Sequence, residues 1–252
     1  MNRDMREQYR FFLKDTVRKK IDFLQTDQSQ GIAPPPAQKP VPPDAAVIPL
    51  PSPLSCPSIT DISLAMAIKN RQSRRNFADI PVTLEELSFL LWSTQGVRKQ
   101  LSLASVLRTV PSAGARHSFE TYLIVRNVTG IDPGVYRYLP LRHGLLFELA
   151  HEHLISKTVD AVFGQSFVAE AAVTFVWTTI PYRMEWRYDL AAHKVIALDA
   201  GHVCQNLYLA CEAIECGTCA IAAYDQEGID ALLHLDGKDE FTIYLAPVGR
   251  KK

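Results

Sequence analysis

The chain has 252 residues, of which 47% are hydrophobic and 21% charged, the composition of a globular protein with one large or two small domains. The 27 basic residues balance the 27 acidic ones, which argues against a nucleic-acid or anionic-membrane partner. No apolar run reaches the roughly 18 residues of a membrane span. Because the N-terminus lacks an apolar signal core and the five cysteines are odd in number, we expect a cytoplasmic protein without a disulfide framework.

Two N-terminal segments differ in composition from the rest of the chain. Apolar residues at spacings of three and four predict a helix over 5–25, in an N-terminal unit of residues 1–26. Prolines then recur between Pro34 and Pro57, and proline fixes its φ angle and lacks an N–H. We therefore expect residues 27–58 to be extended, either as a free linker or as a strap that lies on the domain or on a partner.

Residues 59–252 are expected to form one domain in which helices and strands interleave. Thr83 and Glu86 form a capping box, which predicts a helix that ends at Gly96. Hydrophobic periodicity predicts further helices at 63–68, 152–163, 185–215 and 226–233, and strands at 120–126, 133–149 (a hairpin), 171–180, 219–224 and 241–248. No internal repeat is visible, so the class is α+β or α/β with a layered sheet.

Several common catalytic and binding motifs are absent from the sequence. There is no GxGxxG, GxxxxGK[ST] or GxSxG, which argues against the standard nucleotide loops and the serine-hydrolase elbow. The HEH at 151–153 offers two imidazoles without a third ligand, and a solvated helix start is the favoured interpretation. Cys216 and Cys219 form a CxxC at the end of an expected helix, where the dipole would not stabilise a thiolate, so a dithiol role is not favoured.

Three basic or small-residue segments are candidates for binding an anion. Residues 71–75, RQSRR, offer guanidinium and hydroxyl donors suited to a phosphate, although a solvated basic turn is the alternative. The loop PSAG at 111–114 is flanked by positive charge from Arg108, Arg116 and His117. Arg250 follows a buried strand at the end of the chain. We expect the three segments to converge on one anionic, partly aromatic ligand.

The order of these motifs resembles the flavin-dependent nitroreductase superfamily, and within it the SagB-type dehydrogenase branch, which includes oxidases that aromatise thiazolines and oxazolines. The resemblance covers about residues 60–250 and rests on R-x-S-x-R, "LEELSFLLWSTQG", "RTVPSAGARHSFETYLIVRNV", "PGVYRYLP", "LDAGHVCQNLYLACEAIECGTCAIAAYD" and "LLHLDGKDEFTIYLAPVGR". It implies an α+β layered fold, with a central mixed β-sheet flanked by helices. It also implies a homodimer with FMN at the subunit interface.

The resemblance also implies which residues bind FMN. The first group contacts the phosphate and the ribityl chain, the second lies against the isoalloxazine edge, and the third covers the ring from the other side with its backbone N–H groups. These groups are, in order, Arg71, Gln72, Ser73, Arg75 and Arg250; Pro111, Ser112, Ala113 and Gly114; and Gly217, Thr218, Cys219 and Ala220. The glycine and alanines suit close approach of a backbone to a flat ring. The charged residues beside the PSAG loop would then face a polar rim or the phosphate.

In the implied chemistry a hydride passes to flavin N5 and then to a second substrate. The SagB-type branch carries a Lys-Tyr pair as its base, and Arg187 and Tyr188 occupy these positions here. Arginine stays protonated and is a poor base, so its presence weighs against azoline oxidation more than against FMN binding. The expected catalytic residues are Tyr188 and Arg187, with His193 or Lys194 as further candidates for handling protons.

Three functional hypotheses remain open from the sequence. The first is an FMN-dependent oxidoreductase of SagB type that dehydrogenates a small or peptide-borne heterocycle. The second is an NAD(P)H-dependent reductase of nitro compounds or quinones, which needs no dedicated base. The third is a non-catalytic flavin-binding subunit whose proline-rich segment engages a partner. No metal site is predicted in any of the three.

Overall fold

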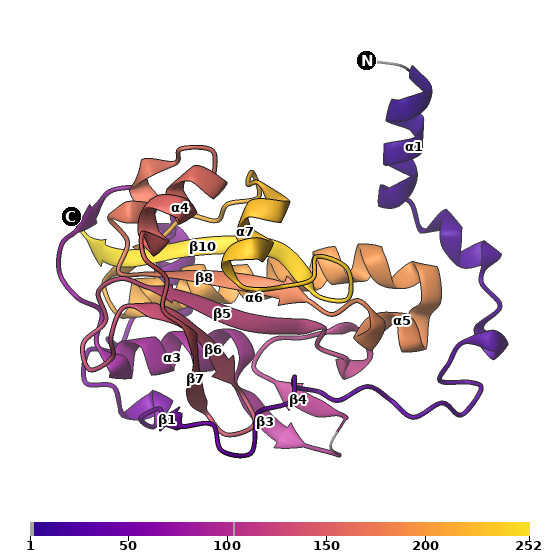
Figure 1. Cartoon of the computed structure of the whole chain (residues 1–252), viewed down its shortest axis with the longest axis horizontal. Helices are drawn as coiled ribbons and strands as arrows, with labels where there is room; N and C mark the ends of the chain where they lie inside the picture. The colour runs from indigo at the N-terminus through magenta and orange to yellow at the C-terminus, as the bar shows by residue number, and fades with distance from the viewer. Residues whose placement is uncertain (1–2, 103) are drawn as a thin grey trace.

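The computed structural model describes residues 3–102 and 104–252, and it is built around one antiparallel sheet (Figure 1). The sheet has the strand order β1-β7-β6-β5-β8-β10-β2, with β9 paired to β10. Its strands are β1 (Val47–Pro49), β2 (Phe77–Ala78), β5 (Phe119–Val125), β6 (Gly134–Leu139), β7 (Gly144–Leu149), β8 (Val173–Thr179), β9 (Cys216–Thr218) and β10 (Phe241–Lys251). A separate two-stranded sheet pairs β3 (Val97–Gln100) with β4 (Val106–Arg108).

Helices cover both faces of this sheet, as the layered α+β prediction requires (Figure 1). The helices are α1 (Arg3–Leu13), α2 (Leu64–Asn70), α3 (Leu84–Gln95), α4 (Leu154–Ala161), α5 (Tyr182–Tyr188), α6 (Ala192–Ala213) and α7 (Gln226–Leu232). Side chains alternate along β5: Leu123 packs with α3 and α6 in one core, whereas Tyr122 and Ile124 pack with α4 and α7 in the other. The predicted layered α+β class is confirmed, with an antiparallel sheet in place of the expected mixed one. The named strands all pair antiparallel, and parallel pairing is limited to two isolated bridges.

Most predicted elements are found close to their expected bounds. The Thr83 side chain accepts from the Glu86 N–H and the Glu86 carboxylate accepts from the Thr83 N–H, so the predicted capping box starts α3, and Gly96 ends it. Ser63 caps α2 in a similar way by accepting from the Met66 N–H. Among the described residues, no helix is long and apolar enough to cross a bilayer.

Three predicted elements have different bounds. The helix expected over 185–215 is two helices, because Asp189 between α5 and α6 has a φ of 49°, outside the helical region. The helix expected over 5–25 ends at Leu13 and gives way to short 3-10 turns. The strand expected at 219–224 is β9, three residues earlier, where Gly217 pairs with Gly249 of β10.

The proline-rich segment lies along the domain and contacts it at several points (Figure 1). Its Ile32 carbonyl accepts from Trp186 Nε1 at 2.9 Å, and its Ala37 carbonyl accepts from Arg108 at 2.8 Å. Lys39 forms an ion pair with the buried Glu240, and β1 adds an edge strand next to β7. We call residues 26–50 the strap. Upstream of it, α1 projects away from the sheet in Figure 1.

Candidate functional site

Tyr208 on α6 brings together two of the predicted FMN-binding segments. Its hydroxyl lies 3.0 Å from the Ser73 hydroxyl and accepts a hydrogen bond from the Ala220 N–H at 2.8 Å. The Arg71 guanidinium lies 5.3 Å from the centre of the Tyr208 ring, and Ser73 also bridges to Thr218. We call Arg71, Ser73, Tyr208 and Ala220 the Tyr208 cluster. The sequence analysis did not single out Tyr208, although its place in a helix close to Cys219 could have suggested it.

The basic residues next to this cluster suit an anionic ligand. Among the described residues, no carboxylate lies within 4 Å of the cations of Arg71, Arg74 or Arg75. The Arg74 stem packs on Gly217, where an added β-carbon would lie 2.5 Å from Arg74 Cδ. Arg74 Nε is buried and has no hydrogen-bond partner. An uncompensated guanidinium and an unpaired donor fit a phosphate group.

Three other predicted FMN-binding residues lie outside the Tyr208 cluster. The Arg75 guanidinium lies 5.9 Å from the centre of the Phe167 ring, and Gln72 is exposed. Arg250 donates to the Glu86 carboxylate at 2.7 Å and to the Ile214 carbonyl at 2.8 Å. Burial lowers the pKa of Arg250, but the hydrogen bond that Arg250 donates to the Glu86 carboxylate raises it, and the net shift is upward. Arg250 is therefore paired with the start of α3.

The predicted isoalloxazine loop and the predicted catalytic pair meet in space. Gly114 has a φ of 57°, and a β-carbon on it would lie 2.6 Å from the Tyr188 hydroxyl and 3.0 Å from Arg187 Cδ. The Arg187 guanidinium in turn lies 5.5 Å from the centre of the Tyr188 ring. Glycine is required here both by the backbone conformation and by the lack of space. Residues 74 positions apart in the chain therefore form one cluster.

Asp199 on α6 supports the same loop from its other side, and the sequence analysis did not single it out. Its Oδ2 accepts from the Ala113 N–H at 3.3 Å, and both this bond and the neighbouring Ser112 side chain lower the pKa of the carboxyl, against the effect of burial. The residue is 4% exposed. We call residues 111–114, Arg187, Tyr188 and Asp199 the loop cluster. Helical spacing could have revealed Asp199, because it falls on the same face as the buried Ile196 and Val203.

The charged residues beside the loop point into the protein, which corrects the expectation that they face a rim or a phosphate. Arg108 is 4% exposed and donates to the Gln95 side chain and the Ala37 carbonyl of the strap. Arg116 donates to the Arg183 carbonyl and lies over the Trp186 ring. Burial, with the nearby Arg108 charge, lowers the pKa of His117 to about 3, so this imidazole is neutral. Arg108, Arg116 and His117 therefore stabilise the protein interior beneath the loop.

The remaining histidine and cysteine candidates are either paired with another side chain or buried. His193, a proposed proton carrier, lies 2.7 Å from Glu185 through its Nε2. Cys216 and Cys219 are buried free thiols, and burial raises the pKa of Cys216 to about 12. Across the described parts of the chain, no group of three or more His, Cys, Asp or Glu side chains could hold a metal ion.

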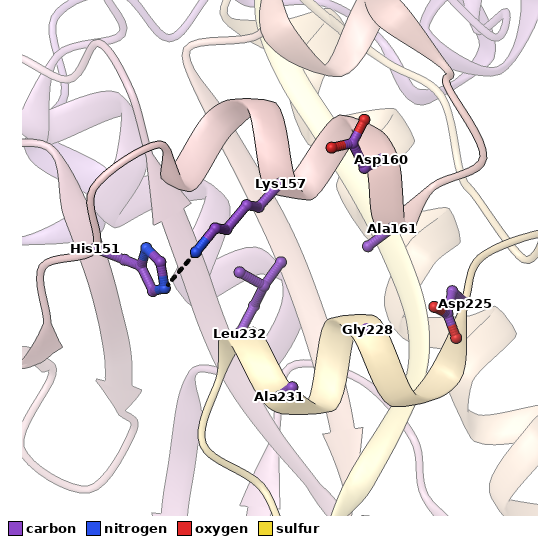
Figure 2. Close-up of a pocket in the computed structure, with 8 residues that line it drawn as sticks. All are labelled: His151, Lys157, Asp160, Ala161, Asp225, Gly228, Ala231 and Leu232. Carbon is purple, nitrogen blue, oxygen red and sulfur yellow. Dashed lines mark hydrogen bonds between the residues drawn. The ribbon is translucent and has the colours of Figure 1, made fainter.

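A cavity of about 370 Å³ between α4 and α7 lies apart from both clusters (Figure 2). His151 and Lys157 face each other across its mouth, with His151 Nε2 and Lys157 Nζ 3.1 Å apart. Asp160 and Asp225 line its other end. None of the residues predicted to bind FMN lines this cavity, and the candidate site consists of the two clusters.

The two clusters lie on opposite sides of α6. Asp199 and Tyr208 are nine positions apart, which in an α-helix corresponds to about 13 Å along the axis and about half a turn around it. One copy of the chain therefore presents the loop cluster and the Tyr208 cluster in opposite directions from this helix.

An α+β fold with this sheet and these helices is that of the nitroreductases. The nitroreductase family model matches residues 68–250, and the chain belongs to this family of oxidoreductases. A relative from Methanocaldococcus jannaschii, "Putative nitroreductase MJ1384", is 32% identical over 198 residues, which are 79% of this chain and 96% of that protein. The trifolitoxin-processing protein TfxB of Rhizobium leguminosarum is 27% identical over 154 residues, 60% of this chain and 41% of TfxB.

Solved structures agree with this assignment. The crystal structure of a Ralstonia eutropha protein, which also carries the nitroreductase name, superposes on this chain with a TM-score of 0.67. The two sequences are 26% identical, and the match covers 86% of this chain and 98% of the Ralstonia chain. The Escherichia coli microcin synthetase McbBCD complex contains a chain with a TM-score of 0.60 and 19% identity, over 78% and 76% of the two chains. The NADPH:FMN oxidoreductase of Vibrio harveyi superposes with a TM-score of 0.53 and is 15% identical, over 75% of this chain and 68% of its own. These last two likenesses show the fold.

Proposed function

We propose that the chain is an FMN-dependent oxidoreductase of SagB type, which dehydrogenates a heterocycle by two-electron transfer. The observation that carries this proposal is the contact between the loop at Gly114 and the pair Arg187 and Tyr188. It brings the residues expected along the flavin edge next to those expected to handle protons. Similarity to the trifolitoxin-processing protein TfxB and to a chain of the microcin synthetase complex supports the same branch.

The residues present suit FMN. Arg71, Ser73 and the unpaired Arg74 Nε would hold the phosphate and the ribityl chain, with Arg75 joining them after a side-chain movement. Residues 111–114 would lie along the ring edge, and 217–220 would cover its other side. When bound, the flavin supplies a hydride acceptor and donor. Tyr188 would hold or transfer the substrate proton, while Arg187, always charged, would orient an anionic group.

A second copy of the chain would complete the site. Because the two clusters face opposite sides of α6, the loop cluster of one copy and the Tyr208 cluster of another are proposed to contact the same FMN. An apolar groove between α2, α3 and α6, lined by Ile62, Phe89 and Trp92 among others, lies beside the exposed Leu64 and Ile68. Exposed apolar surface of this kind favours association of two copies. We therefore propose a homodimer.

The alternative that a specific observation favours is an NAD(P)H-dependent reductase of nitro compounds or quinones. The Methanocaldococcus relative, which carries the nitroreductase name, is matched over 96% of its length. The two functions differ in the electron donor. A reductase takes electrons rapidly from a nicotinamide, whereas a dehydrogenase of SagB type takes them from its heterocycle substrate.

An anaerobic absorbance spectrum before and after addition of NADH or NADPH separates these functions. A flavin spectrum that persists with nicotinamides but bleaches with a thiazoline or oxazoline peptide is expected. Bleaching by nicotinamide within seconds would favour the reductase, and bound flavin that neither donor reduces would favour a non-catalytic subunit. A colourless protein that takes up no added FMN would contradict the proposal.

Two variants test the residue roles. Arg71→Glu is expected to release FMN, because the phosphate would lose its counter-charge, whereas Lys238→Glu on an exposed loop changes the same charge without effect. Tyr188→Phe is expected to retain FMN and lose dehydrogenation. Stoichiometric flavin in Arg71→Glu would contradict the phosphate assignment, and full turnover in Tyr188→Phe would remove Tyr188 from proton handling.

A further inference from the structure

The loop at 111–114 is held by one buried carboxylate. Asp199 accepts from the Ala113 N–H at 3.3 Å, and the Ser112 side chain beside it lowers the pKa of this carboxyl. The Ser112 hydroxyl accepts in turn from the His117 N–H at 3.0 Å. A hydroxyl that accepts one hydrogen bond keeps its own proton free to point at a neighbouring carboxylate. Asp199 thus anchors a chain of contacts through Ala113 and Ser112 that closes the loop from residue 112 to residue 117.

Within the described residues, this carboxylate has no guanidinium or ammonium group within 4 Å. The nearest cation-forming group is His202, whose Nδ1 lies 3.8 Å from Asp199 Oδ1 and whose side chain is half exposed. Burial raises the pKa of Asp199, while the bonds from Ser112 and Ala113 and the charge of His202 oppose that rise. A buried carboxylate is costly unless its acceptors are used. At Asp199 those acceptors are used by the loop.

We propose that Asp199 is a positioning residue for the candidate flavin site: it holds residues 111–114 against Arg187 and Tyr188 and places a fixed negative charge directly behind the loop. The second half of this inference rests on the proposed function, because it concerns the ligand that the loop contacts. The first half concerns the protein alone. A negative charge close to a flavin disfavours the addition of electrons to it, so Asp199 lowers the reduction potential of the site.

Three variants separate these two effects. Asp199→Ala removes both acceptors, Asp199→Asn keeps a carbonyl acceptor without the charge, and Ser112→Ala removes one bond of the chain. Asp230→Ala and Asp230→Asn are matched controls. Asp230 on α7 is also 4% exposed, and it accepts from the Thr242 N–H and from Gln226, both at 2.8 Å. Asp230 is therefore as buried as Asp199 and accepts a similar number of hydrogen bonds, but it does not contact the loop.

Hydrogen exchange of the protein without FMN tests the first half. Loss of charge-assisted hydrogen bonds worth roughly 1.5–3 kcal/mol each corresponds to at least about tenfold faster exchange. We expect that increase over residues 112–117 in Asp199→Ala, a smaller one in Ser112→Ala, and none there in the Asp230 variants. Unchanged exchange in Asp199→Ala would overturn the inference whether or not the protein binds FMN. Should Asp199→Ala fail to fold, Ser112→Ala decides the same point.

Flavin affinity and reduction potential test the second half. In a protein that binds FMN, Asp199→Ala is expected to bind it at least about tenfold more weakly, and Asp199→Asn to regain most of that affinity. The midpoint potential of Asp199→Asn is expected to be more positive than that of the wild type, with no shift in Asp230→Asn. An unchanged potential in Asp199→Asn would overturn this half. A wild type without FMN would contradict the proposed function and this half together, and leave the exchange result standing.

Discussion

The Ser73 and Tyr208 hydroxyls lie 3.0 Å apart, and this contact joins the basic segment after α2 to the long helix α6. The Tyr208 oxygen also accepts from the Ala220 N–H, so one phenol links the segments expected on two sides of the ligand. That arrangement commits the Ala220 N–H to Tyr208. The N–H groups of residues 217–219 that the pairing of β9 with β10 leaves unused are those expected to serve the flavin ring.

Tyr208→Phe should therefore weaken FMN binding while the ring under Arg71 remains. Two hydrogen bonds are lost, each worth about 1 kcal/mol net, which predicts a fall in FMN affinity of up to about thirtyfold. The measurement is a flavin titration of the apoprotein by fluorescence. Tyr224→Phe is the matched control, because the Tyr224 hydroxyl donates to the Thr242 carbonyl at 3.0 Å, and this bond includes no residue of either cluster. Equal affinity in the two variants would contradict the role of Tyr208.

Gly114→Ala should destabilise the loop cluster. An alanine there combines a positive φ with a β-carbon 2.6 Å from the Tyr188 hydroxyl, and we expect a loss of about 1–3 kcal/mol in the free energy of unfolding. Gly130→Ala has a φ of 92° and nothing within 4 Å of the added carbon, so it measures the backbone strain alone. Adding Tyr188→Phe to Gly114→Ala should recover part of the loss. Equal destabilisation by the Gly114 and Gly130 variants would show that the contact of the added β-carbon with the Tyr188 hydroxyl does not contribute to the loss of stability.

Arg250 and Glu86 should behave as a coupled pair in a double-mutant cycle. The Glu86 carboxylate is 2% exposed, and removal of one partner of a buried ion pair typically costs about 3 kcal/mol. Arg250→Gln and Glu86→Gln should each lower the free energy of unfolding, measured by urea titration, and the double variant should lose less than the sum. A stable Arg250→Gln protein that has lost FMN would instead assign Arg250 to the phosphate.

Acid should destabilise the protein through His117. Burial lowers its pKa from 6.5 to about 3, so between these values the unfolded chain binds a proton that the folded chain does not. The free energy of unfolding should therefore fall by up to about 1.4 kcal/mol for each pH unit below about 6.5 from this group. Urea titrations from pH 7 to pH 4 measure the slope. His117→Gln should flatten it relative to the exposed control His234→Gln, and an identical slope in both would contradict the assignment.

Local signals in the sequence were sufficient for most of the fold. The capping box at Thr83, the buried apolar run within 120–126 and the alternation along 133–149 each depend on neighbouring residues, and each predicted its element. The break at Asp189 was missed because apolar periodicity continues through it, from α5 into α6. Local patterns do not encode the φ of 49° that separates the two helices.

The sequence predicted which segments belong to the candidate site, but not which of their residues lie next to one another in space. The approach of Gly114 to Tyr188 and of Ser73 to Tyr208 depends on tertiary packing, which no spacing in the sequence reports. Arg108 was misassigned for the same reason. Its charge suggested a ligand, whereas its acceptor is the Ala37 carbonyl, 71 positions earlier in the chain. Burial lowers the pKa of Arg108 to about 10.

The strap has a consequence for the order of events during synthesis. Lys39 pairs with Glu240, 201 positions later, so a segment made among the first must wait for a partner made among the last. Translation proceeds at about 5–20 residues per second, which leaves Lys39 without Glu240, and the strap without its last contact, for roughly 10–40 seconds. A nascent chain arrested before Glu240 emerges from the ribosome should thus be cut by protease within 27–45, and the released chain should resist.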